Sequence, residues 1–408
     1  MRAVTRVLAT SAFMVFALQA HGGAQGSLPR PLPAISPTPV PTVTTLASRL
    51  DLERYKATIK GLTQFGDRRQ GTERNRKAVD WIEAQLRSYG CSTERVKYTY
   101  DPPPPTQNTA ERPAPPVIPR AVGGGRPRGL QTRTGVNTDP LKQPNEALRA
   151  LNAEPAVNGP REEVFCTKVG TTRPDEMYIV SAHMDGHGWG EAANDDGSGT
   201  ALVMELARIF SMADVRTERT VRFALWNNEE TGLNGAGAYV EQRRALQGKE
   251  NPPGSGKYPE PAWLGMIQHD MMLFDHGMPR ADGTIPPEQR PEADVNIEFQ
   301  SAAKQSAAAQ ALAWYLHAAN EKYATDYPAQ VGPHMTNTDS TPFMDDVAAI
   351  SVRENERGVH VGSGWDPQWH QPTDVFTTYT DRDFRLGLNA AQTTLGAVGE
   401  LVGASIGR

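Results

Sequence analysis

Short apolar runs alternate along the chain with longer segments in which apolar residues recur every three or four positions. Met177–Val180 is a continuous apolar run, which is typical of a strand buried on both faces. Strand patterns are found at residues 92–100, 162–170, 175–183, 219–226, 264–270 and 347–352. Helical patterns are found at about residues 46–63, 74–90, 200–212, 302–322 and 382–402. This alternation predicts an α/β fold with a mainly parallel sheet and helices on both of its faces.

Three segments depart from these patterns. Residues 1–24 begin with two arginines, continue with an apolar run and end in small residues, which predicts a signal peptide cleaved after Ala24, with a permanent N-terminal anchor as the alternative. The proline-rich residues 25–45 predict an extended leader. Residues 101–160 contain DPPPPT and GGGRPRG and predict an irregular surface insertion or a lid. We therefore expect a folded domain over residues 46–408, interrupted by this insertion.

Composition narrows the possible partners and the compartment. The 408 residues carry a formal net charge of -5 and show no basic stripe, so we expect no binding to nucleic acid or to an anionic membrane surface. No stretch after the signal is apolar enough to span a membrane. Export would permit a disulfide between Cys91 and Cys166, although two separate buried thiols are the alternative.

Potential metal ligands gather where the predicted strands end. His183 follows one strand directly, Glu229 and Glu230 follow a second, and Asp270 ends a third. In open α/β sheets, ligands bind beyond the carboxyl ends of the strands, so we expect these side chains to meet at one edge. One glutamate of the adjacent pair can bind a metal while the other faces the substrate as a base.

Two loops add further candidates. Asp195 lies in the glycine-rich sequence NDDGSG, where small residues let backbone approach a cation, although a helix N-cap is the alternative reading. We expect Asp185 to accept the second ring N–H of His183. His370 lies in the loop sequence QWHQPTD, where Asp374 would orient it. Histidine and carboxylate together suit zinc, and the chain contains neither HExxH nor GxSxG.

The motifs SAHMDG, ANDDGSG, NNEETGLNGA, QHDMM and WHQPTD resemble those of the co-catalytic di-zinc aminopeptidases, the twenty-eighth metallopeptidase family, in the same order. The resemblance covers roughly residues 45–405 without the insertion. It implies a twisted, mixed, mainly parallel eight-stranded sheet flanked by helices, the zinc-exopeptidase (phosphorylase/hydrolase-like) fold. It also implies that His183 and Asp270 hold one Zn²⁺, that Glu230 and His370 hold a second, and that Asp195 bridges them. The resemblance further implies that Glu229 acts first as general base and then as general acid.

These observations predict an exported zinc exopeptidase acting on peptides, and within that class an aminopeptidase. A carboxypeptidase or another amidohydrolase on the same fold is the alternative, followed by a single-zinc glutaminyl cyclase and a binding ectodomain without activity. The chain departs from the family at Trp369 and Ser340, where some relatives carry tyrosine and histidine. Four tryptophans in the motif loops either line a substrate pocket or pack in the core: Trp189, Trp226, Trp365 and Trp369. The remaining ligand-type residues are interpreted as structural: His187, Asp275, His276 and His360.

Overall fold

The computed structural model describes residues 32–101, 135–275, 294–333, 338–354 and 366–407, and the structural statements below refer to these ranges. The expected signal peptide lies outside them, as do residues 102–134 of the expected insertion. Within the described ranges, no helix combines the length and the apolar character that crossing a membrane requires.

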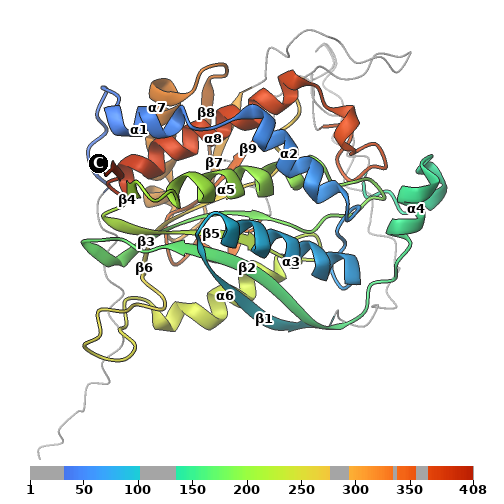
Figure 1. Cartoon of the computed structure of the whole chain (residues 1–408), viewed down its shortest axis with the longest axis horizontal. Coiled ribbons are helices and arrows are strands. Elements are labelled where there is room, and N and C mark those ends of the chain that lie inside the picture. The colour runs from blue at the N-terminus through green and yellow to red at the C-terminus, as the bar shows by residue number, and fades with distance from the viewer. Residues whose placement is uncertain (1–31, 102–134, 276–293, 334–337, 355–365, 408) are drawn as a thin grey trace, which may run out of the picture. The chain divides into compact units, whose positions relative to one another are not determined.

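Eight strands form one sheet in the order β1-β2-β5-β3-β6-β9-β7-β8 (Figure 1). The strands are β1 (Ser92–Tyr100), β2 (Gly159–Lys168), β3 (Arg173–His183), β5 (Arg219–Trp226), β6 (Ala262–His269), β7 (Val295–Phe299), β8 (Ala329–Gly332) and β9 (Ala349–Arg353). The four neighbours β5, β3, β6 and β9 pair in parallel, as do β7 and β8, whereas β1/β2, β2/β5 and β7/β9 are antiparallel. The expected mixed, mainly parallel eight-stranded sheet is therefore confirmed. Two short strands, β4 (Val215–Arg216) and β10 (Ser405–Ile406), form a separate ribbon.

Helices cover both faces of the sheet, but unevenly. The α-helices are α1 (Pro41–Ala47), α2 (Leu52–Thr63), α3 (Glu73–Ser88), α4 (Glu146–Asn152), α5 (Gly197–Phe210), α6 (Asn234–Arg243), α7 (Ser306–Tyr323) and α8 (Asp381–Leu401), with short 3₁₀ turns η1 (Pro140–Lys142), η2 (Arg244–Leu246), η3 (Thr341–Phe343) and η4 (Phe376–Thr378). Figure 1 shows α1, α2, α3, α5, α7 and α8 on one side of the sheet and α6 on the other. Successive residues of β3 alternate between the two faces. Tyr178 and Val180 join the larger apolar core, and Met177 and Ile179 join the smaller core beneath α6.

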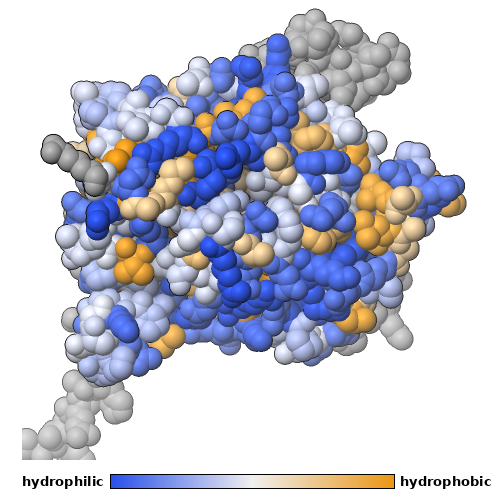
Figure 2. Space-filling view, in the orientation of Figure 1, coloured by the Kyte–Doolittle hydropathy of each residue, from blue (hydrophilic) through white to orange (hydrophobic). Residues whose placement is uncertain are grey.

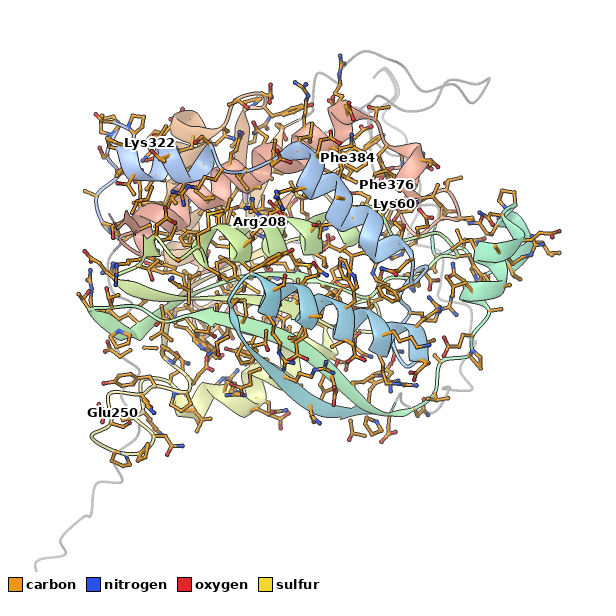
Figure 3. All side chains as sticks on the ribbon, in the orientation of Figure 1. Lys60, Arg208, Glu250, Lys322, Phe376 and Phe384 are labelled. Atoms are coloured by element: carbon orange, nitrogen blue, oxygen red, sulfur yellow. A yellow bond between two sulfur atoms is a disulfide. The ribbon has the colours of Figure 1, made fainter. Side chains whose placement is uncertain are left out.

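The N-terminal part of the fold differs from the sequence prediction in two ways. The expected single helix over residues 46–63 is two helices, because the chain leaves helical conformation after α1 and restarts at α2. There the Asp51 side chain accepts a hydrogen bond from the Arg54 backbone N–H. The folded part also begins before Leu46, because α1 starts at Pro41 inside the expected leader. Lys60 of α2 lies 5.3 Å from the ring centroid of Phe376, which ties α2 to the segment before α8 (Figure 3).

The last part of the expected insertion is ordered rather than irregular. Residues 135–158 contain η1 and α4, and β2 begins directly after them. In Figure 2, apolar side chains gather around α4 on an otherwise mainly hydrophilic face, and the segment exposes several of its own: Val136, Leu141, Leu151 and Val157. Residues 135–158 of the expected irregular insertion therefore contain short regular elements, whereas residues 102–134 lie outside the described ranges.

The two cysteines meet in a disulfide. Cys91, just after α3, is bonded to Cys166 in β2, with a Cα–Cα distance of 5.7 Å. Of the two alternatives that the sequence left open, the structure has the cross-link. The disulfide therefore links the C-terminal end of α3 to strand β2 of the sheet.

Candidate active site

The three strands that carry the predicted ligands lie side by side at the centre of the sheet. In the parallel pairing, His183 at the end of β3 is level with Trp226 at the end of β5, and Ala182 is level with His269 at the end of β6. Asp270, the next residue after β6, therefore reaches the same height as His183. Glu229 and Glu230 stand three and four residues beyond Trp226, so strand ends deliver all these groups to one edge.

Asp195 lies between the two histidines, with one carboxylate oxygen directed at each. Its Oδ1 is 3.3 Å from Nε2 of His183, and its Oδ2 is 2.9 Å from Nε2 of His370. Nε2 of His370 is also 2.9 Å from Oε2 of Glu230, and Nε2 of His183 is 3.8 Å from Oδ1 of Asp270. All five side chains are almost fully buried. The structure thus brings every predicted metal ligand to one place.

The ligand-type atoms form two neighbouring groups. His183, Glu229 and Asp270 make one, and His187, Glu230 and His370 make the other. Within each group the nitrogen and oxygen atoms are close enough to hold one cation, and Asp195 contacts a histidine of each. Glu229, like Glu230, is partly buried as a whole residue.

The loop that carries Asp195 is held by buried hydrogen bonds. Asp374 accepts from the backbone N–H groups of Asn194 and Asp195, at 2.8 and 3.2 Å. This overturns the expectation that Asp374 orients His370, because its carboxylate is committed to the loop. The neighbouring Asp196 caps α5 by accepting from the Gly199 N–H, so the N-cap reading was right for Asp196 rather than for Asp195.

Asp185 supports the site in a different way from the one expected. Nδ1 of His183 lies 3.0 Å from the backbone carbonyl oxygen of Asp185, whereas the Asp185 carboxylate is 3.8 Å away. The carbonyl therefore takes the second ring N–H, and it fixes the tautomer that leaves Nε2 free to bind a cation. The carboxylate instead accepts a hydrogen bond from the backbone N–H of Glu229.

Buried hydrogen bonds hold the carboxylate of Asp270 in place. Its Oδ2 accepts from Nη2 of Arg353 at 2.7 Å and from Oγ1 of Thr338 at 2.8 Å. These bonds leave Oδ1 facing His183. Because Arg353 is itself buried, the ion pair is shielded from solvent and fixes the carboxylate in place.

The carboxylates change the protonation of one another and of the histidines. Burial, reinforced by the charge of Glu230, raises the pKa of Glu229 well above its usual value. Burial alone would raise the pKa of Glu230 as well, but the imidazoles of His187 and His370 lower it to about 2. The same attraction raises the pKa of His370 to about 10 despite its burial. Of the two adjacent glutamates, Glu229 is thus the one whose pKa is raised, as suits a group that exchanges a proton during catalysis.

His187 lies in the second ligand group, a position that sequence reasoning did not anticipate. Interpreted as structural, it instead lies with Glu230 and His370, its Nε2 3.0 Å from Oε2 of Glu230 and 3.1 Å from Nδ1 of His370. Its position four residues after His183 was the only available signal. A histidine in a glycine-rich loop shows no periodicity that would place it.

The other candidates from the sequence have mixed outcomes. Trp226 is fully buried and packs against Tyr239 and Phe343, so it belongs to the core. Trp369 stacks on the ring of His370 with centroids 3.9 Å apart, and the hydroxyls of Ser340 and Ser351 are 3.0 Å apart in the interior. Asp275 accepts from the Tyr327 hydroxyl, as suits a structural residue. Three candidates lie outside the described residues: His276, His360 and Trp365.

Comparison with known proteins gives partial sequence matches. Carboxypeptidase Q of Xenopus laevis is 37% identical over 89 residues, which are 21% of this chain and 19% of that protein. Aminopeptidase YwaD of Bacillus subtilis (strain 168) is 40% identical over 68 residues, which are 17% of this chain and 14% of that protein. The chain thus spans less than a fifth of the length of these curated relatives.

Solved structures match over most of the chain. The aminopeptidase from Aneurinibacillus sp. strain AM-1 has a TM-score of 0.56 at 18% identity, covering 90% of this chain and 97% of that one. The zinc aminopeptidase BSAP from Bacillus subtilis gives 0.57 at 16%, covering 86% and 95%. Porphyromonas gingivalis glutaminyl cyclase gives 0.51 at 13%, covering 86% and 98%. At these identities the likeness establishes the fold, which proteins of different chemistry share.

The family follows from a separate comparison. Residues 164–391 match the family model described as Peptidase family M28, and this range holds every residue of the two ligand groups. The match covers more than half of the chain. The chain therefore belongs to Peptidase family M28, a metallopeptidase family.

Proposed function

We propose that this protein is an exported exopeptidase that uses two zinc ions and releases N-terminal residues from peptides. In this proposal His183 and Asp270 hold one zinc, Glu230 and His370 hold the other, and Asp195 bridges them. The observation that carries the proposal is the placement of Asp195, whose two oxygens face one histidine of each group.

The residues fit zinc on chemical grounds. Imidazole nitrogen and carboxylate oxygen are ordinary zinc ligands. Within the described part of the chain, Oε1 of Glu230 is buried and has no hydrogen-bond partner, which suits an atom directed at a cation. Bound cations would also offset the mutual repulsion of the acids gathered here.

Two zinc ions held in this way would acidify a bound water and polarise the carbonyl of the scissile bond. Glu229 would then carry the proton transfer, since its carboxylate lies beside His183 and Asp270 and its pKa is raised. It takes a proton from the attacking water and returns it to the leaving amine. The hydrogen bond from the Glu229 N–H to Asp185 keeps this residue in position.

Replacing Glu229 with Gln tests the mechanism. We expect Glu229→Gln to lower kcat by about 10²- to 10⁴-fold while zinc content stays unchanged, because the amide cannot carry the proton. Glu241→Gln, the same change at an exposed position in α6, is the matched control and should keep full activity. Normal turnover by Glu229→Gln would refute the assignment, and zinc-free wild-type protein that turns over normally would refute the proposal as a whole.

Two features support the finer parts of the proposal. The structural neighbours described as aminopeptidases favour cleavage at the N-terminus, whereas the matched segment of carboxypeptidase Q favours the alternative. Peptides blocked only at the N-terminus or only at the C-terminus distinguish the two, and loss of cleavage on N-terminal acetylation is the result we expect. The Cys91–Cys166 disulfide supports export, since such bonds persist in oxidising compartments. N-terminal sequencing of the exported protein should begin at Gln25.

A further inference from the structure

His187 occupies a fixed position beside His370. The rings meet edge to face, with centroids 4.0 Å apart, and Nε2 of His187 is within hydrogen-bond distance of Nδ1 of His370. Nε2 of His370 points the other way, toward Asp195 and Glu230. His187 thus contacts the nitrogen of His370 that faces away from the bridging carboxylate.

The backbone around His187 is held on the His370 loop. Gly188 has φ +101°, and a Cβ at this position would overlap the backbone carbonyl of His370. Asn137 donates from its side chain to the Gly188 carbonyl at 3.4 Å and from its backbone to the His370 carbonyl at 3.0 Å. Gln143 donates to the carbonyls of Trp189 and Pro372, both at 2.8 Å. The contact between the two histidines is therefore built into the fold rather than left to a mobile surface loop.

Zinc bound at Nε2 of His370 would determine which ring nitrogen of this residue carries the proton. A neutral imidazole that ligates through Nε2 must hold its proton on Nδ1, and that N–H needs an acceptor. Among the described residues, Nε2 of His187 is the acceptor that lies within reach. The tautomer of His187 with its proton on Nδ1 supplies the required lone pair, whereas the other tautomer would donate to Glu230 at 3.0 Å when no cation is present.

We propose that His187 is a positioning residue of the second zinc site, and that it fixes His370 in the tautomer and orientation that bind the ion. The inference rests on the proposed function, since it requires zinc at Glu230 and His370. A role as a direct ligand fits less well, because the single Nε2 lone pair of His187 cannot both bind an ion and accept from Nδ1 of His370.

Zinc titrations of the full-length protein against a competing chelator test this role. His370→Ala first identifies which binding step belongs to the Glu230 and His370 site. We then expect His187→Ala to weaken that step by about 10- to 100-fold and to leave the other step unchanged. His187→Gln should recover most of the lost affinity, because its amide oxygen can accept from Nδ1 of His370 while its NH₂ group can donate to Glu230.

The possible results separate this inference from the proposed function. Equal affinity of wild type and His187→Ala would overturn the inference, and so would a loss as large as that of His370→Ala without rescue by Gln, which would make His187 a ligand. The proposed function would instead be overturned if wild-type protein bound fewer than two zinc ions. It would also be overturned if His370→Ala retained both binding steps.

A measurement on the unaltered protein covers the case in which a variant fails to fold. With histidine labelled with ¹⁵N, the zinc-loaded protein should show His370 protonated on Nδ1 and His187 unprotonated on Nε2. A proton on Nε2 of His187 in the loaded protein would contradict the inference.

Discussion

We predict that the protein loses stability in acid because of the buried imidazole of His269. The residue is fully buried at the end of β6, where Nδ1 donates to the Ser181 carbonyl at 3.1 Å and Nε2 accepts from the Thr394 hydroxyl at 2.8 Å. The neutral form therefore satisfies both ring nitrogens without placing a charge in the interior. Burial lowers the pKa of His269 from 6.5 to about 4, although the hydrogen bond to Ser181 opposes this.

The sign of the effect follows from proton uptake. The unfolded chain protonates His269 near pH 6.5, whereas the folded protein does not until about pH 4, so acid favours the unfolded state. The stabilisation is fully present above about pH 6.5 and is lost as the pH falls toward 4. The complete difference is about 3 kcal/mol, at about 1.4 kcal/mol for each unit of pKa. About 2 kcal/mol of it is lost between about pH 7 and pH 5.

Urea unfolding of the zinc-free protein at these two pH values measures the loss. Other titrating groups also contribute, so the relevant quantity is the difference in pH dependence between wild type and His269→Gln, whose amide can donate to Ser181 but does not titrate. We expect the free energy of unfolding of wild type to fall by about 2 kcal/mol more than that of the variant. Identical pH dependence in the two proteins would refute the reasoning, whatever the stability of the variant at neutral pH.

Two other predictions concern the backbone at Gly188 and the Cys91–Cys166 disulfide. Gly188→Ala should weaken zinc binding at the site containing His370, because the added methyl group displaces the His370 carbonyl. Gly237→Ala, whose added Cβ meets no atom within 4 Å, should leave zinc titrations unchanged, and equal affinities for the two variants would contradict this explanation. Replacing Cys91 and Cys166 by Ser opens a loop with a sequence separation of 75 residues and should lower the free energy of unfolding in urea by about 4 kcal/mol. An unchanged urea midpoint would show that the cross-link contributes nothing.

The central fold could be predicted from the sequence because its strands carry strong patterns. Met177–Val180 is apolar at every position, and it is buried on both faces as that pattern predicts. Strand β7 was not predicted, although Val295, Ile297 and Phe299 alternate with polar residues as in a strand; the run has only five residues, and the burial of Asn296 and Glu298 is not encoded by such a pattern. Helix α6 was missed because it begins with small residues after Leu233 in left-handed conformation.

In the site, too, the residues at strand ends could be predicted, whereas the contacts between irregular loops could not. His183 and Asp270 could be assigned to one place because each directly ends a strand, and parallel pairing fixes the height of strand ends. The contact of His187 with His370 depends on two irregular loops and on the segment 135–158 that holds them together. Such contacts arise from loop geometry at positive φ, as at Gly188 and His370, and no periodic pattern encodes them.

The order of the ligands along the chain has a consequence for biosynthesis. Four of the five proposed ligands, His183, Asp195, Glu230 and Asp270, are synthesised with or directly after strands β3, β5 and β6. His370 is synthesised about a hundred residues later, after β9. Until His370 is synthesised, the growing polypeptide contains the carboxylates of the centre without this histidine. If the centre binds metal as proposed, the complete set of ligands exists only once His370 has been synthesised, and a chain truncated before His370 would lack both this residue and α8.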